Sequence, residues 1–329
     1  MKVVVTGGTG FLGQRLVRAL CERGTLTDSA GRERAIERIV AVDQGQCSEP
    51  FADSRVVYAL GDISDAAFAG AAVADDTDSL FHLAAVVSGA AERDFDLGMR
   101  VNLDGTRLLL EACRRGKPAP KVVFASSVAV FGQPLPAVVT DATTPTPQTS
   151  YGTQKLASEL LVNDFSRKGF VDGRSVRLPT IVVRPGKPNA AASSFASGII
   201  REPLAGEESV CPVEPSTGVW MSSPGTAVAA FIHAHEVPKE LWATVRSLNL
   251  PGITATVAEM IDALRAAAGD AVAARVSFQV DEPIAAIVRS WPARFETPRA
   301  IWMGFPQDAD FASILRDYMQ HYAPALLRG

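Results

Sequence analysis

The chain has 329 residues, and its composition, 47% hydrophobic and 21% charged, is that of a globular protein. A chain of this length forms one large or two moderate domains and buries enough apolar surface to need neither disulfides nor a structural metal. The formal net charge of -4 argues against a surface for nucleic acid or an anionic membrane. No apolar run approaches the roughly 18 residues that a membrane helix needs.

The four cysteines, Cys21, Cys47, Cys113 and Cys211, include no C-x-x-C pair. Only four histidines accompany them, so a zinc site is not expected. Free thiols in a reducing compartment are the simplest interpretation. The sequence enters a strand at once, without the charged and apolar segments of a signal peptide. We therefore expect a cytoplasmic protein.

Short β-branched runs alternate with amphipathic stretches over the first part of the chain. The predicted strands are Lys2–Thr6, Ile36–Asp43, Arg55–Leu60, Ser79–Leu83, Lys121–Ser126 and Val176–Arg184. The predicted helices, with apolar residues at helical spacing, are Phe11–Arg23, Asn102–Arg115 and Tyr151–Arg167. Strands that alternate with helices indicate right-handed βαβ units and an α/β fold with a doubly wound parallel sheet.

Other segments depart from this alternation. The polar stretch 25–38 is longer than the connection needs, and we interpret it as a surface insertion that helps to place the next strand. Residues 134–148, rich in Pro and Thr, form a loop. Beyond Pro185, Pro, Gly and Ser interrupt short helices, which suits a smaller mixed α/β lobe. We expect a cofactor-binding and catalytic domain over 1–185 and a substrate-binding lobe over 186–329, from which some segments can return to the first domain.

A glycine-rich turn, GGTGFLG over residues 7–13, joins the first predicted strand to the first predicted helix. Its spacing allows a tight turn, close backbone approach to a pyrophosphate and helix-to-strand packing. The pyrophosphate would lie on the N–H groups of the helix N-terminus, where the helix dipole favours it. Glycine clusters are common in turns, but this one follows a strand and opens a helix. It predicts a dinucleotide site that includes Gly7, Gly10, Phe11, Leu12 and Gly13.

Asp43 closes the second predicted strand, where a carboxylate accepts hydrogen bonds from the adenosine ribose of a dinucleotide. No Arg follows it in residues 44–46 to receive a 2′-phosphate, so the sequence favours NAD over NADP. The plainer alternative is that Asp43 caps a turn. Asp62 and Ile63, after the third strand, are candidates for adenine contacts, and a turn aspartate is nearly as good an explanation.

Small residues, Leu83, Ala84 and Ala85, end the fourth strand and let a cofactor lie across the sheet edge. Asn102 orders the neighbouring strand, relays a proton or caps its helix, and the sequence leaves these alternatives open. All four residues are assigned to the cofactor site.

Tyr151 and Lys155 stand four residues apart and therefore on one helix face. A phenol with its ordinary pKa of about 10 is a poor base at neutral pH. An ammonium group one turn away and a positively charged nicotinamide favour the phenolate. Ser126 and Ser127 end the preceding strand, where a hydroxyl would hold a substrate oxygen beside the phenol. Serine there is also common turn chemistry.

Together these motifs resemble the extended short-chain dehydrogenase/reductase superfamily, which includes the NAD-dependent epimerase/dehydratase family. The matching residues are Gly7, Gly10, Gly13, Asp43, Asp62, Leu83, Ala84, Ala85, Asn102, Ser126, Ser127, residues 128–132, Tyr151 and Lys155. The resemblance implies a Rossmann-type sheet and bound NAD, with Tyr151 as acid and base, Lys155 lowering the phenol pKa and Ser127 orienting the substrate. It also implies that Pro179 and Thr180 contact the nicotinamide through backbone groups, and that the protein is a homodimer through the Tyr151 helix.

The residues after these motifs indicate the branch of the family. Nucleotide-sugar 4,6-dehydratases carry acidic residues after the active-site Thr, whereas Val128 and Ala129 stand here. The segment 177–195 also lacks the N-x-Y-G-P-like stretch of many sugar-nucleotide epimerases. It resembles dehydrogenases of small sugar acids, as do residues 200–204 and 250–254. This implies NAD-dependent oxidation of the C2 hydroxyl of a four-carbon acid, D-erythronate, to 2-dehydro-D-erythronate.

A sugar acid needs a few hydrogen-bonding groups and one cation for its carboxylate. The candidate substrate ligands are Ser126, Ser127, Tyr151, Lys187, Asn189 and Arg201, and a solvated surface position is an equal alternative for the last three. The alternative functions are a nucleotide-sugar epimerase or dehydratase that retains its NAD, and a non-catalytic NAD-sensing protein. Net NADH formation separates a dehydrogenase from both.

Overall fold

The computed structural model describes residues 1–47, 49–116, 118–186 and 192–323. The chain folds as two compact units, and each unit is assembled from separate stretches of sequence. Unit 1 comprises Met1–Val130, Thr149–Arg177 and Val228–Asn249, and unit 2 comprises Phe131–Gln148, Leu178–Ala227 and Leu250–Gly329. The expected functional division after residue 185 stays a prediction.

Unit 1 contains the main sheet and its helices. Its strands are β1 (Lys2–Thr6), β2 (Thr25–Thr27), β3 (Glu33–Ala35), β4 (Arg38–Asp43), β5 (Val56–Leu60), β6 (Ser79–His82), β7 (Lys121–Ser127), β8 (Asp172–Leu178) and β12 (Ser247–Asn249). Its helices are α1 (Phe11–Arg23), α2 (Ala66–Val73), α3 (Ser88–Arg93), α4 (Phe95–Gly98), α5 (Gly105–Cys113), α6 (Ser150–Arg167), α9 (Lys239–Trp242) and the C-terminal part of α8 (Pro224–Glu236). A π-helical segment (Met99–Asp104) precedes α5, and a 3-10 turn (Val128–Val130) follows β7.

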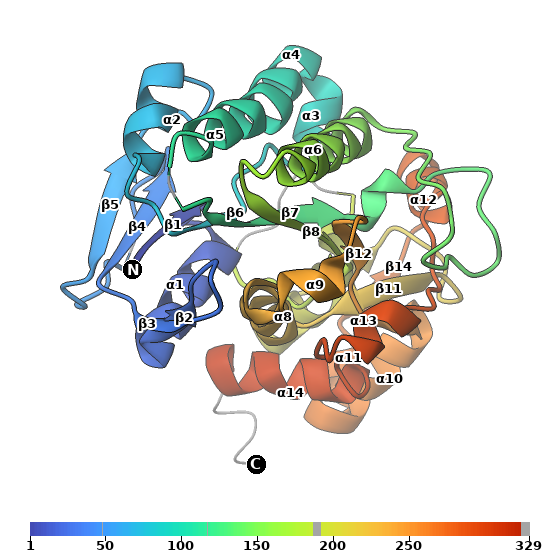
Figure 1. The fold of residues 1–329 in the computed structure, drawn as a ribbon. Coiled ribbons are helices and arrows are strands. Elements are labelled where there is room, and N and C mark those ends of the chain that lie inside the picture. The colour runs from blue at the N-terminus through green and yellow to red at the C-terminus, as the bar shows by residue number, and fades with distance from the viewer. Residues whose placement is uncertain (48, 117, 187–191, 324–329) are drawn as a thin grey trace. The chain divides into compact units, whose positions relative to one another are not determined.

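Seven strands form one sheet in the order β12-β8-β7-β6-β1-β4-β5. The pairs β1–β4, β1–β6, β4–β5, β6–β7 and β8–β12 are parallel. Figure 1 shows α2, α5 and α6 on one face of this sheet and α1 and α9 on the other. Strand order reverses direction between β1 and β6, so the predicted doubly wound α/β fold is confirmed. The carboxyl ends of β1 and β6 form the switch point at which such sheets bind ligands.

The sheet is held by apolar residues on both of its faces. Successive residues Val3, Val4 and Val5 of β1 are fully buried, as expected for a central parallel strand. Val4 and Phe124 belong to the core on the α2, α5 and α6 side. The sheet therefore forms a rigid base for the loops that leave its carboxyl edge.

The predicted strand Val176–Arg184 is wrong. β8 ends at Leu178, and Thr180–Ile181 form β9, which pairs with β11 (Gly218–Ser222) in a separate sheet of unit 2. Pro179 explains the break, because it has no N–H to donate to the β8 ladder. The apolar pattern continues through the proline, so the pattern by itself predicts one strand where the structure has two.

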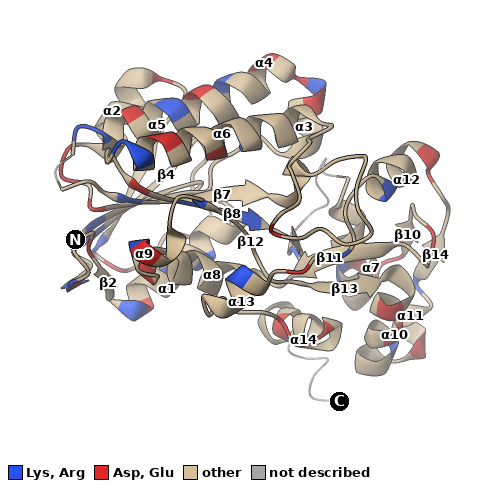
Figure 2. Cartoon of the chain, turned by 45° about the vertical axis from the view of Figure 1, so that its right-hand side comes forward, with Lys and Arg blue, Asp and Glu red and all other residues tan. Residues whose placement is uncertain are grey.

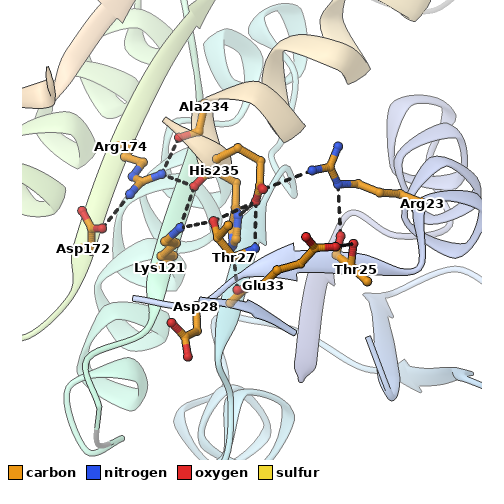
Figure 3. Close-up of polar contacts among 12 residues, drawn as sticks. Arg23, Thr25, Thr27, Asp28, Glu33, Lys121, Asp172, Arg174, Ala234 and His235 are labelled. Atoms are coloured by element: carbon orange, nitrogen blue, oxygen red, sulfur yellow. Dashed lines mark hydrogen bonds and ion pairs between the residues drawn. The ribbon is translucent and has the colours of Figure 1, made fainter. Parts of the chain in front are cut away.

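The predicted insertion at residues 25–38 contains the antiparallel hairpin β2–β3. Figure 3 shows how polar contacts fix it to the end of α8. Glu236 accepts hydrogen bonds from the backbone N–H and the hydroxyl of Thr27, both at 3.2 Å, and pairs with Arg23 at 3.1 Å. The insertion is thus tied to the helix layer below the sheet.

Two buried cations bond the last carbonyls of α8 (Figure 3). Lys121 Nζ donates to the carbonyl of His235 at 3.0 Å, and Arg174 donates to the carbonyl of Ala234 at 2.6 Å and to that of His235. Positive groups at a helix C-terminus satisfy its free carbonyls and interact favourably with its dipole. They fix α8 where β7 and β8 begin.

Unit 2 has short strands and helices around its own core. Its remaining strands are β10 (Ser209–Cys211), β13 (Ile253–Thr256) and β14 (Val276–Phe278). Its helices are α7 (Ser194–Leu204), α10 (Val257–Ala268), α11 (Asp270–Ala273), α12 (Glu282–Arg289), α13 (Pro298–Trp302) and α14 (Phe311–Tyr322). The sheets are β13-β11-β9 and β10-β14, which gives the expected smaller mixed α/β part.

Figure 2 shows acidic and basic segments mixed along the ribbon in each unit. Within the described ranges, no helix is both long and apolar enough to cross a membrane.

Candidate active site

The glycine turn after β1 is packed so closely that Gly7, Gly8 and Gly13 leave no room for a Cβ. Gly7 has a φ of +71°, and a Cβ there would lie 2.9 Å from the backbone nitrogen of Ala84. A Cβ on Gly8 would lie 2.9 Å from Ala41, and one on Gly13 would overlap the Gly7 carbonyl. The turn is therefore pressed against β4, against the end of β6 and against itself.

Gly10 is the N-cap of α1 and makes no side-chain cap. The first N–H groups of the helix, those of Phe11, Leu12 and Gly13, therefore face the position that a diphosphate takes in dinucleotide sites. A Cβ on Gly10 would meet only the Gly7 carbonyl, at 3.2 Å, so the other side of this residue is open. The turn fits the diphosphate of NAD.

Asp43 ends β4 beside this turn, as predicted. Its Oδ2 accepts a hydrogen bond from the Thr9 N–H at 3.1 Å, and its Oδ1 accepts one from the Gln44 N–H at 2.8 Å. The side chain thus braces the glycine turn, as the turn-capping alternative expects. A carboxylate has lone pairs left for ribose hydroxyls, so its contact with NAD stays a prediction.

Asp62 and Ile63 follow β5. Asp62 Oδ1 accepts hydrogen bonds from the N–H and the hydroxyl of Ser64 at 2.8 and 2.7 Å. Burial acts to raise its pKa, but the Ser64 hydrogen bonds, together with Arg100 and Gln44, outweigh burial and the pKa is lowered. Ile63 is buried in the core of unit 1. Their adenine contacts stay predictions, and the structure also shows the turn role of Asp62.

Leu83, Ala84 and Ala85 follow β6 at the switch point, and Asn102 fixes the backbone just beyond them. Asn102 Oδ1 accepts from the Val86 N–H at 2.7 Å, and its Nδ2 donates to the Val86 carbonyl at 3.0 Å and to Gln154 at 2.8 Å. Asn102 lies inside the π-helical segment. Of the three alternatives, the structure shows the one that orders the strand end, with a link to α6.

Tyr151 and Lys155 lie in the first turns of α6. The helix begins where Thr149 Oγ1 accepts the Gly152 N–H at 3.1 Å, a common N-cap arrangement. Lys155 is 2% exposed, and its Nζ donates to the Ala125 carbonyl at 2.9 Å. The same Nζ lies 5.6 Å from the centre of the Tyr151 ring. The predicted pair is thus one cation and one phenol against the end of β7.

Burial shifts the pKa of Lys155 from 10.5 down to about 7, although the nearby Glu159 carboxylate acts to raise it. A lysine in this range gains or loses its proton near neutral pH. Its charge, and with it the ease of ionising Tyr151, is therefore set by its surroundings.

The two serines at the end of β7 differ in their surroundings. Ser127 is partly exposed, and its Oγ accepts the Ala129 N–H at 3.1 Å, so the hydroxyl proton can still be donated. Ser126 is buried and donates to Glu159 at 2.5 Å. Ser127 is thus the better placed of the two predicted substrate ligands, and the role of Ser126 as a ligand stays a prediction.

Sequence reasoning missed Glu159 and Gln154 on α6. Both are buried: Gln154 accepts from Asn102, and Glu159 pairs with Arg177 at 2.7 Å. The available signal was spacing, since Tyr151, Lys155 and Glu159 recur every four residues along one helix face.

The remaining predicted residues belong to unit 2. Pro179 precedes β9, and Thr180 begins it. Arg201 donates to the Arg184 carbonyl at 2.8 Å and pairs with Glu202 at 2.5 Å, so much of its guanidinium is already bonded. Lys187 and Asn189 lie outside the described residues. Each of these ligand assignments stays a prediction.

Comparisons with known proteins agree with this arrangement. The model of the NAD dependent epimerase/dehydratase family matches residues 3–252. The D-erythronate dehydrogenase of Cupriavidus necator is 53% identical over 320 residues, which cover 97% of this chain and 98% of that protein. The D-erythronate dehydrogenase of Haemophilus influenzae is 44% identical over 98% and 99% of the two chains.

Among solved structures, the nucleoside-diphosphate-sugar epimerase from Agrobacterium tumefaciens superposes with a TM-score of 0.92 at 42% identity. The match covers 98% of this chain and 95% of that one.

Proposed function

The chain belongs to the NAD-dependent epimerase/dehydratase family, and we propose that it oxidises the C2 hydroxyl of D-erythronate to 2-dehydro-D-erythronate with NAD. The observation that carries the proposal is the 53% identity with the Cupriavidus necator enzyme over nearly the whole of both chains. The D-erythronate dehydrogenase of Haemophilus influenzae, 44% identical to this chain, supports the same proposal.

The residues of unit 1 supply the acid–base chemistry that such an oxidation needs. NAD, when bound at the glycine turn, would supply the acceptor for the hydride of the substrate. Tyr151, as phenolate, takes the hydroxyl proton of the substrate, and Ser127 donates a hydrogen bond to the same oxygen. Lys155, as ammonium, stabilises the phenolate. The N-terminus of α1 and its glycine turn bind the diphosphate, and Asp43 binds the adenosine ribose.

The chain also holds candidates for substrate recognition. The substrate carboxylate is bound best by a cation. The proposed ligands are Lys187, Arg201 and Asn189. Arg201 already bonds Arg184 and Glu202, which favours Lys187 as the main cation. The proposed substrate is thus a small sugar acid.

A nucleotide-sugar epimerase is the second candidate, because a structure described as such an epimerase is 42% identical. Val128 and Ala129 leave no acid beside Ser127, which disfavours dehydration but not epimerisation. The two functions differ in stoichiometry, because an epimerase returns its hydride to the substrate.

The test is a screen of the purified protein with NAD and four- to six-carbon sugar acids, together with UDP-sugars. We expect NADH to accumulate in proportion to D-erythronate consumed and no turnover of a UDP-sugar. Epimerisation of a UDP-sugar without NADH formation from any aldonate would refute the proposal.

A further inference from the structure

A buried carboxylate, Glu159, joins the elements on which the proposed catalytic residues lie. It follows Lys155 by about one turn of α6 and is 2% exposed. It accepts the Ser126 hydroxyl at the end of β7 at 2.5 Å. It also accepts Arg177 Nε and Nη2, from β8, at 2.9 and 2.7 Å. Three elements of unit 1 thus meet at one side chain.

Packing alone does not call for a carboxylate here. Burying an ion pair has a large desolvation cost, and apolar side chains of similar size often hold such a junction equally well. What an apolar side chain cannot supply is a negative charge one turn from Lys155, or a directed bond to the residue before Ser127.

Lys155 has few other groups that favour its charge. Its Nζ bonds one neutral carbonyl, that of Ala125, at 2.9 Å, and lies 4.7 Å from the centre of the Phe124 ring. Burial lowers its pKa to about 7, and the Glu159 carboxylate opposes this shift. Without that carboxylate, the pKa of Lys155 would fall further, and the lysine would lose its proton at a lower pH.

We infer that Glu159 is a positioning residue of the hydride-transfer site, which holds the end of β7 against α6 and keeps Lys155 in its charged form. The inference rests on the proposed roles of Tyr151 and Lys155. Glu159 acts through these residues and through Ser126.

The titratable groups around Lys155 within the described part of the chain are few. Tyr151 and Glu159 lie on its own helix, and Arg177 reaches it from β8 through Glu159. His82, on β6, interacts with Lys155, but burial lowers its pKa to about 3, so it is neutral over the range that matters. Glu159 is the one carboxylate in this group.

The test is an ultraviolet titration of phenolate formation in the protein without substrate or cofactor. The chain has four tyrosines, and subtracting the titration of Tyr151→Phe isolates Tyr151. Glu159→Gln keeps an oxygen for Ser126 but removes the charge. We expect the Tyr151 midpoint to move to higher pH by about one unit, a roughly tenfold change in proton affinity, because a less charged Lys155 stabilises the phenolate less.

The matched control is Asp172→Asn, which removes the charge of another buried carboxylate. Asp172 pairs with Arg174 and Arg246 at the opposite end of β8, so we expect it to lower stability and leave the Tyr151 midpoint unchanged. If Glu159→Gln does not fold, the double variant Glu159→Gln/Arg177→Gln leaves no unpaired charge. Its shift should have the same direction but be smaller, because loss of the more distant Arg177 charge partly offsets loss of the carboxylate.

An unchanged Tyr151 midpoint in the folded Glu159 variant, or an equal shift in the Asp172 control, would overturn the inference. The pH profile of kcat/KM for D-erythronate should follow the titration, with its acid limb at higher pH in Glu159→Gln. If the titration shifts but the parent protein makes no NADH, the proposed function fails and the role of Glu159 stands.

Discussion

Replacing Tyr151 by Phe removes one oxygen atom and leaves the ring beside Lys155. The variant therefore loses the proposed base, the phenol oxygen, but keeps the glycine turn, Asp43 and Lys155. General acid–base catalysis contributes about 100- to 10,000-fold. We expect kcat to fall by at least about 100-fold while the Kd for NAD, measured by calorimetry, changes by only a few fold. Turnover equal to that of the parent would show that Tyr151 is not the base.

Asp43 is the residue at which cofactor selection is tested. Its carboxylate bonds the Thr9 N–H and would repel a 2′-phosphate. Asp43→Ala should weaken NAD binding by about tenfold, which corresponds to the loss of one charge-assisted hydrogen bond. It should also lower the ratio of the NADP dissociation constant to the NAD dissociation constant. Asp43→Asn, which keeps an acceptor for Thr9, separates bracing from charge. A ratio unchanged in both variants would mean that Asp43 only caps its turn.

The sequence alone predicted the residues that carry a motif but not those that support them. Gly7, Tyr151 and Lys155 have fixed spacings that follow from turn and helix geometry. Glu159 looks like an ordinary helix-surface glutamate until Ser126 and Arg177 are brought to it from other strands. Such pairs depend on tertiary register, which a single sequence does not show.

At the scale of elements, strands are predictable where the chain alternates cleanly between strand and helix. β1 and α1 have the predicted bounds, and β4 begins at Arg38 rather than Ile36. The hairpin at residues 25–35 was not predicted, because its strands are short and polar and are held partly by tertiary contacts such as that of Thr27 with Glu236. Local pattern thus determines long elements better than short ones.

The end of α8 makes the stability of the fold sensitive to acid. His235 is buried, with Nε2 2.7 Å from Ser79 Oγ, and burial lowers its pKa from 6.5 to about 4. The unfolded chain therefore binds this proton first as the pH falls. The free energy of unfolding should decrease between about pH 6.5 and 4, by up to about 3 kcal/mol for this group.

Urea unfolding at a series of pH values checks this expectation. His235→Gln should reduce the change in the free energy of unfolding between about pH 6.5 and 4. The change that remains includes the contribution of His82, whose pKa burial also lowers. Ser79→Ala should reduce stability while retaining a pH dependence in the same range. An equally steep pH dependence in His235→Gln would contradict the assignment.

At the scale of the whole molecule, we propose that the chain forms a homodimer through α6 and neighbouring helices. Leu160 on α6 is 64% exposed and Phe95 on α4 is 57% exposed, and large apolar groups outside a core favour association. Leu160→Glu should shift the mass measured by light scattering from dimer to monomer. Lys168→Glu, at the end of the same helix, is the control for added negative charge. A monomeric parent would refute the proposal.

The most direct test of the proposed reaction follows the hydrogen on C2 of the substrate. D-erythronate with deuterium at C2 should yield deuterated NADH and 2-dehydro-D-erythronate, one of each for every substrate consumed, and Tyr151→Phe should abolish both. Formation of NADH without deuterium, or loss of C2 deuterium to water without formation of NADH, would contradict hydride transfer from C2 at this site.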